Sequence, residues 1–435
     1  MKNDEECFEK YDEEIYKLKI LLNILKQNGK KVFIYGASPK ESTLLKYAKI
    51  SSDLVEYVVT NSYSEEQMRE LKPDYLLVEP WHFKKEICER EQEFLKTGGT
   101  LIFPLPKVEC VYTKPHIFVT GVCGQIGKSV CSEFADYTII GLTKEIPYNK
   151  HQNVIYVKND IDIISLCLSI FSPQACIHLS SITRTETGFS KENQNASPLE
   201  VYRSDALVIT EICDSIVKNA LRCSVFNASS SEIYKGYGTY CVREDDNKFL
   251  PYNPYSIGKV LTTSLIQYYR KNYGKHFSNG IIFTTESQNR SNEFLLKKVS
   301  LYLAKLKEKI SSPQCCPPTL NIGSLCSSRI IQHTSDVAKA IKIIFEQPKG
   351  DDYIICGLEQ KTCLELVLEL CRIHGFEPWH TENSIFDKTS GRLLISYSTS
   401  EFSRQSETHI SGRPEKLLSL GWKPMSTENV LKSLM

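Results

Sequence analysis

Two side chains able to move a proton stand four residues apart in the segment NPYSIGK. The pattern over residues 254–273 predicts a helix, and the spacing places Tyr255 and Lys259 on one face of it. A lysine cation beside a phenol lowers the pKa of the phenol. Tyr255 could therefore take a proton from a hydroxyl group while a hydride leaves the same carbon atom. The pair indicates dehydrogenase chemistry, which needs a hydride acceptor.

The stretch VTGVCGQIGKSV could hold the phosphates of such an acceptor. Its ending Gly-Lys-Ser is similar to an ATPase phosphate loop, but that loop needs a glycine where Val122 stands. The glycines fit T-G-x-x-G-x-x-G instead, a strand-to-helix turn that binds a dinucleotide. Gly121 permits the tight turn, Gly124 the approach of the pyrophosphate, and Gly127 the packing of helix on strand. We expect the helix to start near Gln125.

Strand-like and helix-like runs alternate twice along the 435 residues. An amphipathic helix over residues 8–27 precedes a small α/β unit that ends near Pro106. The second alternation starts at HIFVTG and continues through YTIIGL, NVIYVKND, QACIHLSS, CSVFNASS and SNGIIFT. It predicts a doubly wound parallel sheet, the Rossmann arrangement, with helices over residues 200–218 and 254–273. From about residue 285 the elements become shorter and mixed.

Charge and composition exclude several classes of protein. Lysine and arginine number 53 and aspartate and glutamate 52, so no basic surface for nucleic acid is expected. No apolar run approaches the roughly 20 residues of a membrane helix, and the start MKNDEECFEK lacks the apolar core of a secretory signal. The sixteen cysteines form no C-x-x-C pair. We expect a cytoplasmic protein with reduced thiols and no metal site.

From about residue 115 to 435 the chain resembles extended short-chain dehydrogenases/reductases, most closely the GDP-mannose 4,6-dehydratases. The motifs TGVCGQIG, NASSSEIY, NPYSIGK, NGIIFTTESQNR and EKLLSLGWKP carry the resemblance. It implies that Ser230, Glu232, Tyr255 and Lys259 are catalytic in a lyase reaction on a nucleotide sugar. C4 would be oxidised, Glu232 would remove the C5 proton as water is lost, and hydride would return to C6. The product would be a 4-keto-6-deoxy sugar.

The resemblance also implies a nicotinamide cofactor. Lys144 stands where NAD-preferring enzymes place an acid, which favours NADP, whereas the adjacent Glu145 keeps NAD open. Asp160 is expected beside the adenine, and residues 179–181 along the path to the nicotinamide. The residues expected to bind the cofactor are Gly121, Cys123, Gly124, Gln125, Ile126, Gly127, Lys144, Asp160, Ile161, Leu179, Ser180, Ser181, Tyr255 and Lys259.

The expected nucleotide-sugar site departs from the family pattern. TTESQNRS stands where the family has N-H-E-S-P-R-R-G and grips the diphosphate and base. The base and the sugar therefore stay open. Two alternatives also stay open: a nucleotide-sugar epimerase or reductase of the same fold, and a non-catalytic protein that binds NADP or a nucleotide sugar. The residues expected to bind the substrate are Glu286, Arg290, Lys298 and Arg329.

Residues from about 30 to 108 resemble the C-terminal domain of sugar C-methyltransferases, through VFIYGASPKESTLLKYAKI and PDYLLVEPWHF. Glu41 replaces the last glycine of that family's GASxKG, and a Pro-Gly-Thr loop is missing. We expect a degenerate scaffold without methyl transfer. The predicted domains are residues 1–112, the methyltransferase-like α/β domain, and 113–435, divided into an NADP-binding Rossmann part (about 113–285) and a mixed substrate-binding portion (about 286–435).

The resemblance further implies how the chain assembles. In extended short-chain dehydrogenases, the helices corresponding to residues 200–218 and 254–273 pair across a two-fold axis as a four-helix bundle. The dehydratases add a long arginine-rich segment that builds tetramers, and here the short TKEIPYNKHQN takes its place. We therefore expect a homodimer.

Overall fold

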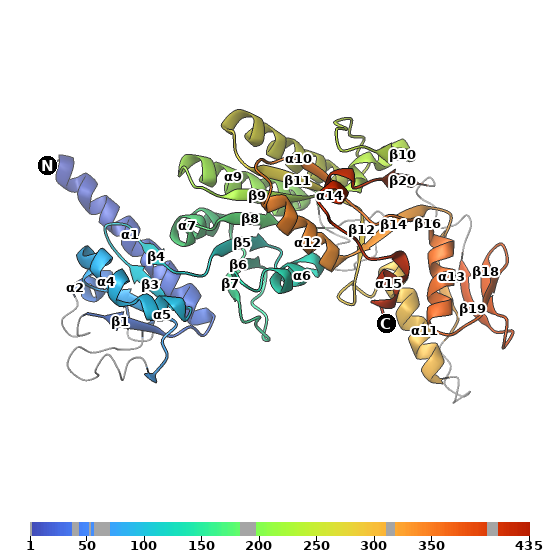
Figure 1. Cartoon of the computed structure of the whole chain (residues 1–435), viewed down its shortest axis with the longest axis horizontal. Helices are drawn as coiled ribbons and strands as arrows, with labels where there is room; N and C mark the ends of the chain where they lie inside the picture. Colours follow the sequence, from blue (N-terminus) through green and yellow to red (C-terminus); the bar gives the residue numbers. More distant parts are fainter. Residues whose placement is uncertain are drawn as a thin grey trace. The chain divides into compact units, whose positions relative to one another are not determined.

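The computed structural model describes residues 2–36, 43–51, 54–55, 70–182, 197–309, 318–397 and 408–435 (Figure 1). By its contacts the chain forms two compact units. The first comprises Met1–Thr120, Phe134–Cys176 and Asp214–Cys223, and the second comprises Gly121–Glu133, Ile177–Cys213 and Ser224–Met435. Glu41 lies outside the described residues. Within the described ranges, no helix has the length and apolar character that a membrane crossing requires.

The N-terminal part consists of a long helix and a small sheet. Helix α1 (Lys2–Gln27) buries Ile15, Leu18, Leu22 and Leu25 of the predicted apolar face, whereas Tyr11, predicted on the same face, is exposed. The sheet has the order β1-β2-β3-β4, with the first three strands parallel and the last antiparallel. Its elements are β1 (Val32–Tyr35), α2 (Thr43–Ala48), β2 (Tyr75–Val78), η1 (Trp81–Phe83), α4 (Lys84–Arg90), α5 (Gln92–Lys96), β3 (Thr100–Phe103) and β4 (Glu109–Val111).

The loop after α1 pairs with an edge strand of the main sheet, β7 (Val154–Lys158), inside the first unit. The Asn28 side chain donates to the carbonyl of Tyr156 at 2.8 Å and accepts from its N–H at 2.8 Å. One amide side chain thus pairs with both backbone groups of Tyr156 at the sheet edge, as a neighbouring strand would. The hydroxyl of Tyr112 also donates to the carbonyl of Phe171, at 2.9 Å. The N-terminal part is therefore joined to β7 and to the end of α7 (Ile161–Phe171) by hydrogen bonds to backbone groups.

The main sheet has seven strands in the order β15-β11-β9-β8-β5-β6-β7. The chain runs outward from β5 to β7 and then returns to build the other half, which is the doubly wound order. The predicted Rossmann sheet is thereby confirmed. Its strands are β5 (His116–Thr120), β6 (Thr138–Thr143), β7, β8 (Ala175–His178), β9 (Ser224–Ser230), β11 (Phe277–Ile282) and β15 (Asp352–Ile355).

The start of helix α10 (Pro254–Tyr273) is determined by the capping residue that precedes it. In α10, the Asn253 side chain accepts from the N–H of Ser256, and proline occupies the first turn. This fixes the start of the helix that carries Tyr255 and Lys259. The other helices are α6 (Gln125–Glu133), α7 (Ile161–Phe171), α8 (Pro198–Tyr202), the π-helical turn η2 (Arg203–Leu207), α9 (Val208–Lys218) and α12 (Thr334–Phe345).

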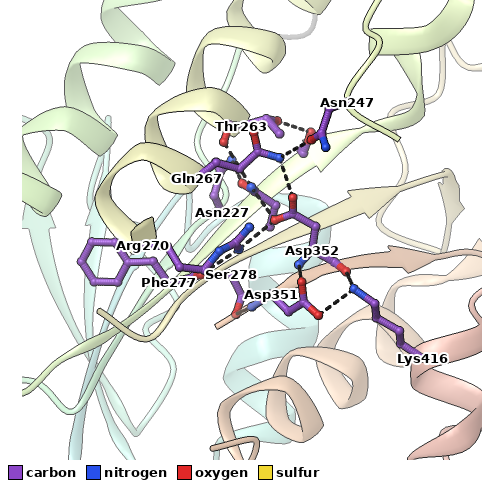
Figure 2. Close-up of polar contacts among 12 residues, drawn as sticks. Asn227, Asn247, Thr263, Gln267, Arg270, Phe277, Ser278, Asp351, Asp352 and Lys416 are labelled. Atoms are coloured by element: carbon purple, nitrogen blue, oxygen red, sulfur yellow. Dashed lines mark hydrogen bonds and ion pairs between the residues drawn. The ribbon is translucent and has the colours of Figure 1, made fainter. Parts of the chain in front are cut away.

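Buried polar side chains fasten α10 to the sheet (Figure 2). Asp352, at the start of β15, accepts from Arg270 at 2.9 Å and from Gln267 at 2.6 Å, both on α10. It also accepts from Asn279 of β11 at 2.9 Å, and Asn227 of β9 donates to Asn279 at 2.9 Å. Partners left unpaired in such a network would cost free energy, so α10 has one favoured position on three strands.

Two smaller sheets accompany the main sheet, and most of their strands come from the C-terminal portion of the chain. One has the order β10-β20-β14-β12, with β16 paired to β14, and the other has the order β13-β19-β18-β17. Helices α11 and α13 and the latter sheet share one apolar core. The elements are η3 (Ser231–Tyr237), β10 (Thr239–Val242), β12 (Thr284–Glu286), α11 (Leu295–Lys309), β13 (Leu320–Ile322), β14 (Ser328–His333), β16 (Gln360–Thr362), α13 (Cys363–Ile373), β17 (Pro378–His380), β18 (Ser384–Asp387), β19 (Leu393–Tyr397), β20 (His409–Gly412), α14 (Glu415–Ser419) and α15 (Thr427–Lys432).

Candidate active site

The glycine turn after β5 has the geometry that a dinucleotide needs. Gly121 has φ +68°, a conformation that residues with a Cβ rarely adopt, and α6 begins at Gln125 as predicted. A Cβ on Gly127 would clash with the carbonyl oxygens of Gly121 and Val122. A Cβ on Gly124 would meet only the Gly121 oxygen, at 3.0 Å, among the described residues. The turn therefore leaves space beside Gly124, just before α6 begins, which suits a pyrophosphate.

Lys128 and Ser129, which would serve an ATPase phosphate loop, both have protein partners. The ammonium of Lys128 donates to Asn289 at 3.4 Å, and the hydroxyl of Ser129 donates to Thr334 at 2.8 Å. Gln125 donates its side-chain amide to the carbonyl of Thr285 at 3.0 Å. The start of α6 is thus packed against TTESQNRS, the segment that departs from the family pattern.

The residues expected near the adenosine half of the cofactor come directly after two neighbouring strands. β6 and β7 pair in parallel with Thr143 opposite Lys158, so Lys144 and Asp160 both follow the carboxyl ends of these strands. Both side chains are exposed. Asp160 caps α7 by accepting from the N–H of Asp162 at 3.1 Å, and Ile161 begins that helix. In the glycine turn, Cys123 is exposed and Ile126 is half-buried.

Ser230 and Tyr255 meet at the carboxyl end of β9. Their side chains form a hydrogen bond, and the ammonium of Lys259 lies 5.8 Å from the centre of the Tyr255 ring. Burial raises the pKa of Tyr255, whereas Lys259 and the hydrogen bond from Ser230 act to lower it. Capping of α10 and the end of β9 bring these residues together from sequence positions 25 apart. The group has the composition that oxidation of an alcohol requires.

A buried carboxylate that the sequence analysis did not identify holds Lys259. Asp205, fully buried, accepts from Lys259 at 3.0 Å, from Ser181 at 2.9 Å and bonds with the ring nitrogen Nε2 of His178 at 2.9 Å. Burial opposes ionisation, yet Lys259 and the bond to His178 lower the pKa of Asp205 to about 2. Burial also lowers the pKa of His178. Ser180 donates to the carbonyl of Ser204, at 3.1 Å.

Asp205 lies in η2, one π-helical turn between α8 and α9. Such turns insert one residue into a helix and occur often at functional sites. The sequence carried one signal for it, an acid in the otherwise apolar run SDALVI within the predicted helix. An acid at a buried helical position needs a cation or hydrogen-bond donors. The acid alone does not predict which residues pair with it, because His178 and Lys259 are far from Asp205 in the chain.

Glu232, expected as the proton acceptor at C5, follows Ser230 in η3. Its Oε2 accepts from the hydroxyl of Tyr252 at 2.6 Å, and its Oε1 pairs with the ammonium of Lys235 at 2.6 Å. The N–H of Glu232 donates to the hydroxyl of Ser230 at 3.2 Å. Neither Tyr252 nor Lys235 was among the residues predicted to form the site.

Three of the four expected substrate residues form one charged group. Glu286 is buried, and burial raises its pKa, while Arg290, Arg329 and Lys297 act to lower it. Arg290 donates to the carbonyl of Thr285 at 2.7 Å, and its guanidinium lies over the ring of Phe294 at 3.7 Å.

Arg329, on β14, belongs to the same charged group as Glu286 and Arg290. Its pKa is raised by Cys363 first and also by the carboxylates of Glu286 and Glu232, against the effect of burial. The side chain of Lys298 makes no hydrogen bond or ion pair with the described residues. The neighbouring Lys297 donates to the carbonyl of Leu434 at 3.1 Å.

The doubly wound sheet, the glycine turn and the Ser230–Tyr255–Lys259 group define a short-chain dehydrogenase/reductase. Residues 118–434 match the family described as GDP-mannose 4,6 dehydratase, and the chain belongs to this family of nucleotide-sugar dehydratases and epimerases. Residues 3–65 and 61–106 match the C-methyltransferase C-terminal domain. Both resemblances expected from the motifs are confirmed.

Individual relatives are distant. The chain is 23% identical over 329 residues to a GDP-mannose 4,6-dehydratase from Sordaria araneosa, covering 71% of this chain and 58% of the relative's length. The UDP-glucose 4-epimerase of Thermotoga maritima, solved with UDP-glucose, gives a TM-score of 0.57 at 17% identity over 73% of this chain and 97% of that one. RMD from Pseudomonas aeruginosa, complexed with NADPH, gives 0.55 at 18% identity over 74% and 96%. These structures are similar to the chain in fold.

Asp205→Ala is expected to lower the free energy of unfolding by about 3–5 kcal/mol, because it leaves the buried Lys259 ammonium unpaired. Asp214→Ala is the matched control on α9, where the carboxylate is 40% exposed and lies 3.5 Å from Lys218. That change should cost at most about 1 kcal/mol. Urea unfolding of the full chain measures both. Equal effects of the two substitutions would contradict a structural ion pair at Asp205.

Proposed function

We propose that the protein is a nucleotide-sugar 4,6-dehydratase of the GDP-mannose type. The observation that carries the proposal is the end of β9, where the Ser230–Tyr255 pair lies two residues from the carboxylate of Glu232. Ser230, Tyr255 and Lys259 suit oxidation of an alcohol, and Glu232 adds a base for a second proton. An epimerase that acts through C4 alone would need the first three residues only. The carboxylate therefore favours the dehydratase.

Each residue has one task in the proposed reaction. Tyr255 takes the proton of the C4 hydroxyl, and Ser230 holds that oxygen by a hydrogen bond. Loss of this proton together with the C4 hydride gives a ketone, which acidifies the C5–H bond. Glu232 takes the C5 proton, the C5–H electron pair forms a C5–C6 double bond, and the C6–O bond breaks as Glu232 passes that proton to the hydroxyl, which leaves as water. A solvent proton adds to C5 when hydride returns to C6. Lys259, held by Asp205, keeps a positive charge beside the phenol.

The proposed cofactor is NADP, held by the glycine turn, residues 179–181, Asp160 and Lys144. When bound, a nicotinamide supplies the acceptor for the C4 hydride and later the donor of hydride to C6. The exposed ammonium of Lys144 at the end of β6 supports NADP, because it can pair with a ribose phosphate. The NADPH complex of the structurally similar RMD also supports this choice. The adjacent Glu145 is the feature that would favour NAD.

The proposed substrate is a nucleotide sugar, with GDP-mannose as the first to test. Arg290 and Arg329 bring two guanidinium groups to the buried Glu286. Guanidinium groups recognise the paired oxygens of a diphosphate, and they stay charged in a partly buried site. Residues 1–112 are proposed to act as a scaffold for this catalytic part, supported by the hydrogen bonds of Asn28 to β7.

Glu232→Gln keeps the size of the side chain and removes its ability to accept the C5 proton. The variant should still oxidise C4, so reduced cofactor should accumulate, while water loss falls about 100- to 10,000-fold. Solvent deuterium should also stop entering C5. A single-turnover assay by absorbance and mass spectrometry measures all three, with NADP and NAD compared in parallel.

Tyr255→Phe is the control for this assay, because it should abolish C4 oxidation while NADP still binds. Water loss by Glu232→Gln at the wild-type rate would refute the dehydratase. An epimerase acting through C4 would turn over without accumulating reduced cofactor. A larger burst of reduced cofactor with NAD than with NADP would overturn the choice of cofactor.

We propose that the chain forms a homodimer through α10 and the segment from α8 to α9. Ile257, Leu261 and Tyr268 lie on one face of α10 and are between 43% and 53% exposed, and Leu199 and Leu207 are exposed on the neighbouring segment. Light scattering should give the mass of a dimer, and Leu261→Arg should give a monomer, because a charge at the centre of an apolar interface is costly. A monomeric or tetrameric wild-type protein would contradict the proposal.

A further inference from the structure

Each oxygen of the Glu232 carboxylate contacts a side chain that can donate a hydrogen bond to it. The phenol of Tyr252 donates to Oε2 at 2.6 Å, and the ammonium of Lys235 lies 2.6 Å from Oε1. The same ammonium lies 5.7 Å from the centre of the Tyr252 ring. Three side chains thus contact one another pairwise. We call this group the Glu232 clamp.

The clamp is held by two segments of the chain. Lys235 stands three residues after Glu232 in the 3₁₀ helix η3, where side chains at this spacing lie one above the other. Tyr252 precedes the cap of α10, and its N–H donates to the hydroxyl of Ser256 at 3.0 Å. The phenol therefore reaches Glu232 from the segment just before the helix that carries Tyr255. Movement of either segment would change the direction of the carboxylate.

A carboxylate with two such donors keeps enough capacity to accept a further proton. Each carboxylate oxygen has two lone pairs, so one hydrogen bond to each oxygen leaves a free lone pair on each. Short charge-assisted hydrogen bonds to both oxygens restrict the rotamer of the side chain. The side chains of Glu232 and Lys235 are 26% and 22% exposed, so the carboxylate is accessible while held.

We propose that Tyr252 and Lys235 are positioning residues that hold the Glu232 carboxylate in one rotamer, directed at the C5 proton. The inference rests on the proposed dehydratase function, since it assigns Glu232 the second proton transfer. The Glu232 clamp then acts in the step at C5, whereas Ser230, Tyr255 and Lys259 act in the step at C4. Neither positioning residue exchanges a proton with the substrate.

Tyr252→Phe removes one hydroxyl and keeps the ring over Lys235. The variant should oxidise C4 at the wild-type rate, while deuterium exchange at C5 and water loss fall about 10- to 100-fold, the cost of a misdirected catalytic group. Lys235→Met should act in the same sense, and Lys235→Arg should restore most of the rate because it keeps the charge. Stopped-flow absorbance reports the C4 step, and mass spectrometry reports the C5 step.

Two comparisons distinguish positioning from a structural role. Tyr237→Phe is the matched control, since the hydroxyl of Tyr237 in the same η3 helix donates to the carbonyl of Lys248 instead. It should leave both steps unchanged. In a Glu232→Gln background, Tyr252→Phe should cause no further loss at C5, because it acts through the carboxylate. Equal losses from Tyr252→Phe in both backgrounds, or equal losses at C4 and C5, would overturn the inference.

The inference can fail separately from the proposed function. If the wild type dehydrates a nucleotide sugar and Tyr252→Phe does so equally fast, the clamp is wrong and the function stands. If the wild type turns over no nucleotide sugar, the function fails, and crystal structures of the wild type and Tyr252→Phe test the clamp. The carboxylate should contact Tyr252 and Lys235 in the wild type and change rotamer in the variant. An unchanged rotamer would overturn the clamp.

Discussion

The buried ion pair between Asp205 and Lys259 is the interaction on which the candidate active site depends. Neither side chain has appreciable contact with solvent, so each charge requires the other. Asp205 also bonds His178, at the end of β8, and Ser181, just beyond it. One carboxylate therefore fixes the loop after β8, the turn η2 and the helix α10 relative to one another. A lysine fixed in this way holds its charge beside Tyr255.

The two proton transfers of the proposed reaction involve separate, rigidly held groups. Lys259 is positioned by α10, and Ser230 is positioned by the end of β9. The hydrogen bonds of Asp352, at the start of β15, hold α10 on the sheet. Glu232 is set by Tyr252 and Lys235. A dehydratase has to perform both transfers on one bound sugar without releasing it. Fixed acid and base groups at adjacent positions lower the entropic cost of that sequence.

The sequence predicted the parts of this structure that depend on local patterns. Strand-like runs of buried residues and helical spacing indicated the doubly wound sheet, and the glycine spacing indicated a turn in which Gly121 has positive φ. The i, i+4 spacing of Tyr255 and Lys259 gave their common helix face. The partners of these residues were not predictable. Asp205 meets Lys259 from 54 positions earlier in the chain, and Tyr252 meets Glu232 from 20 positions later, distances over which no periodicity carries information. The roles of the predicted site residues, Lys298 among them, stay predictions.

Mass spectrometry of the wild-type protein incubated with NADP and a panel of nucleotide sugars tests the central claim most directly. The account predicts that one nucleotide sugar, GDP-mannose first among those tested, loses the mass of one water and acquires a carbonyl group that a reducing agent converts back to an alcohol. The cofactor should be unchanged at the end, because the hydride returns to the same sugar. A product of unchanged mass would show an epimerase, and tight binding of a nucleotide sugar without any product would show a non-catalytic protein. Either result would contradict the account.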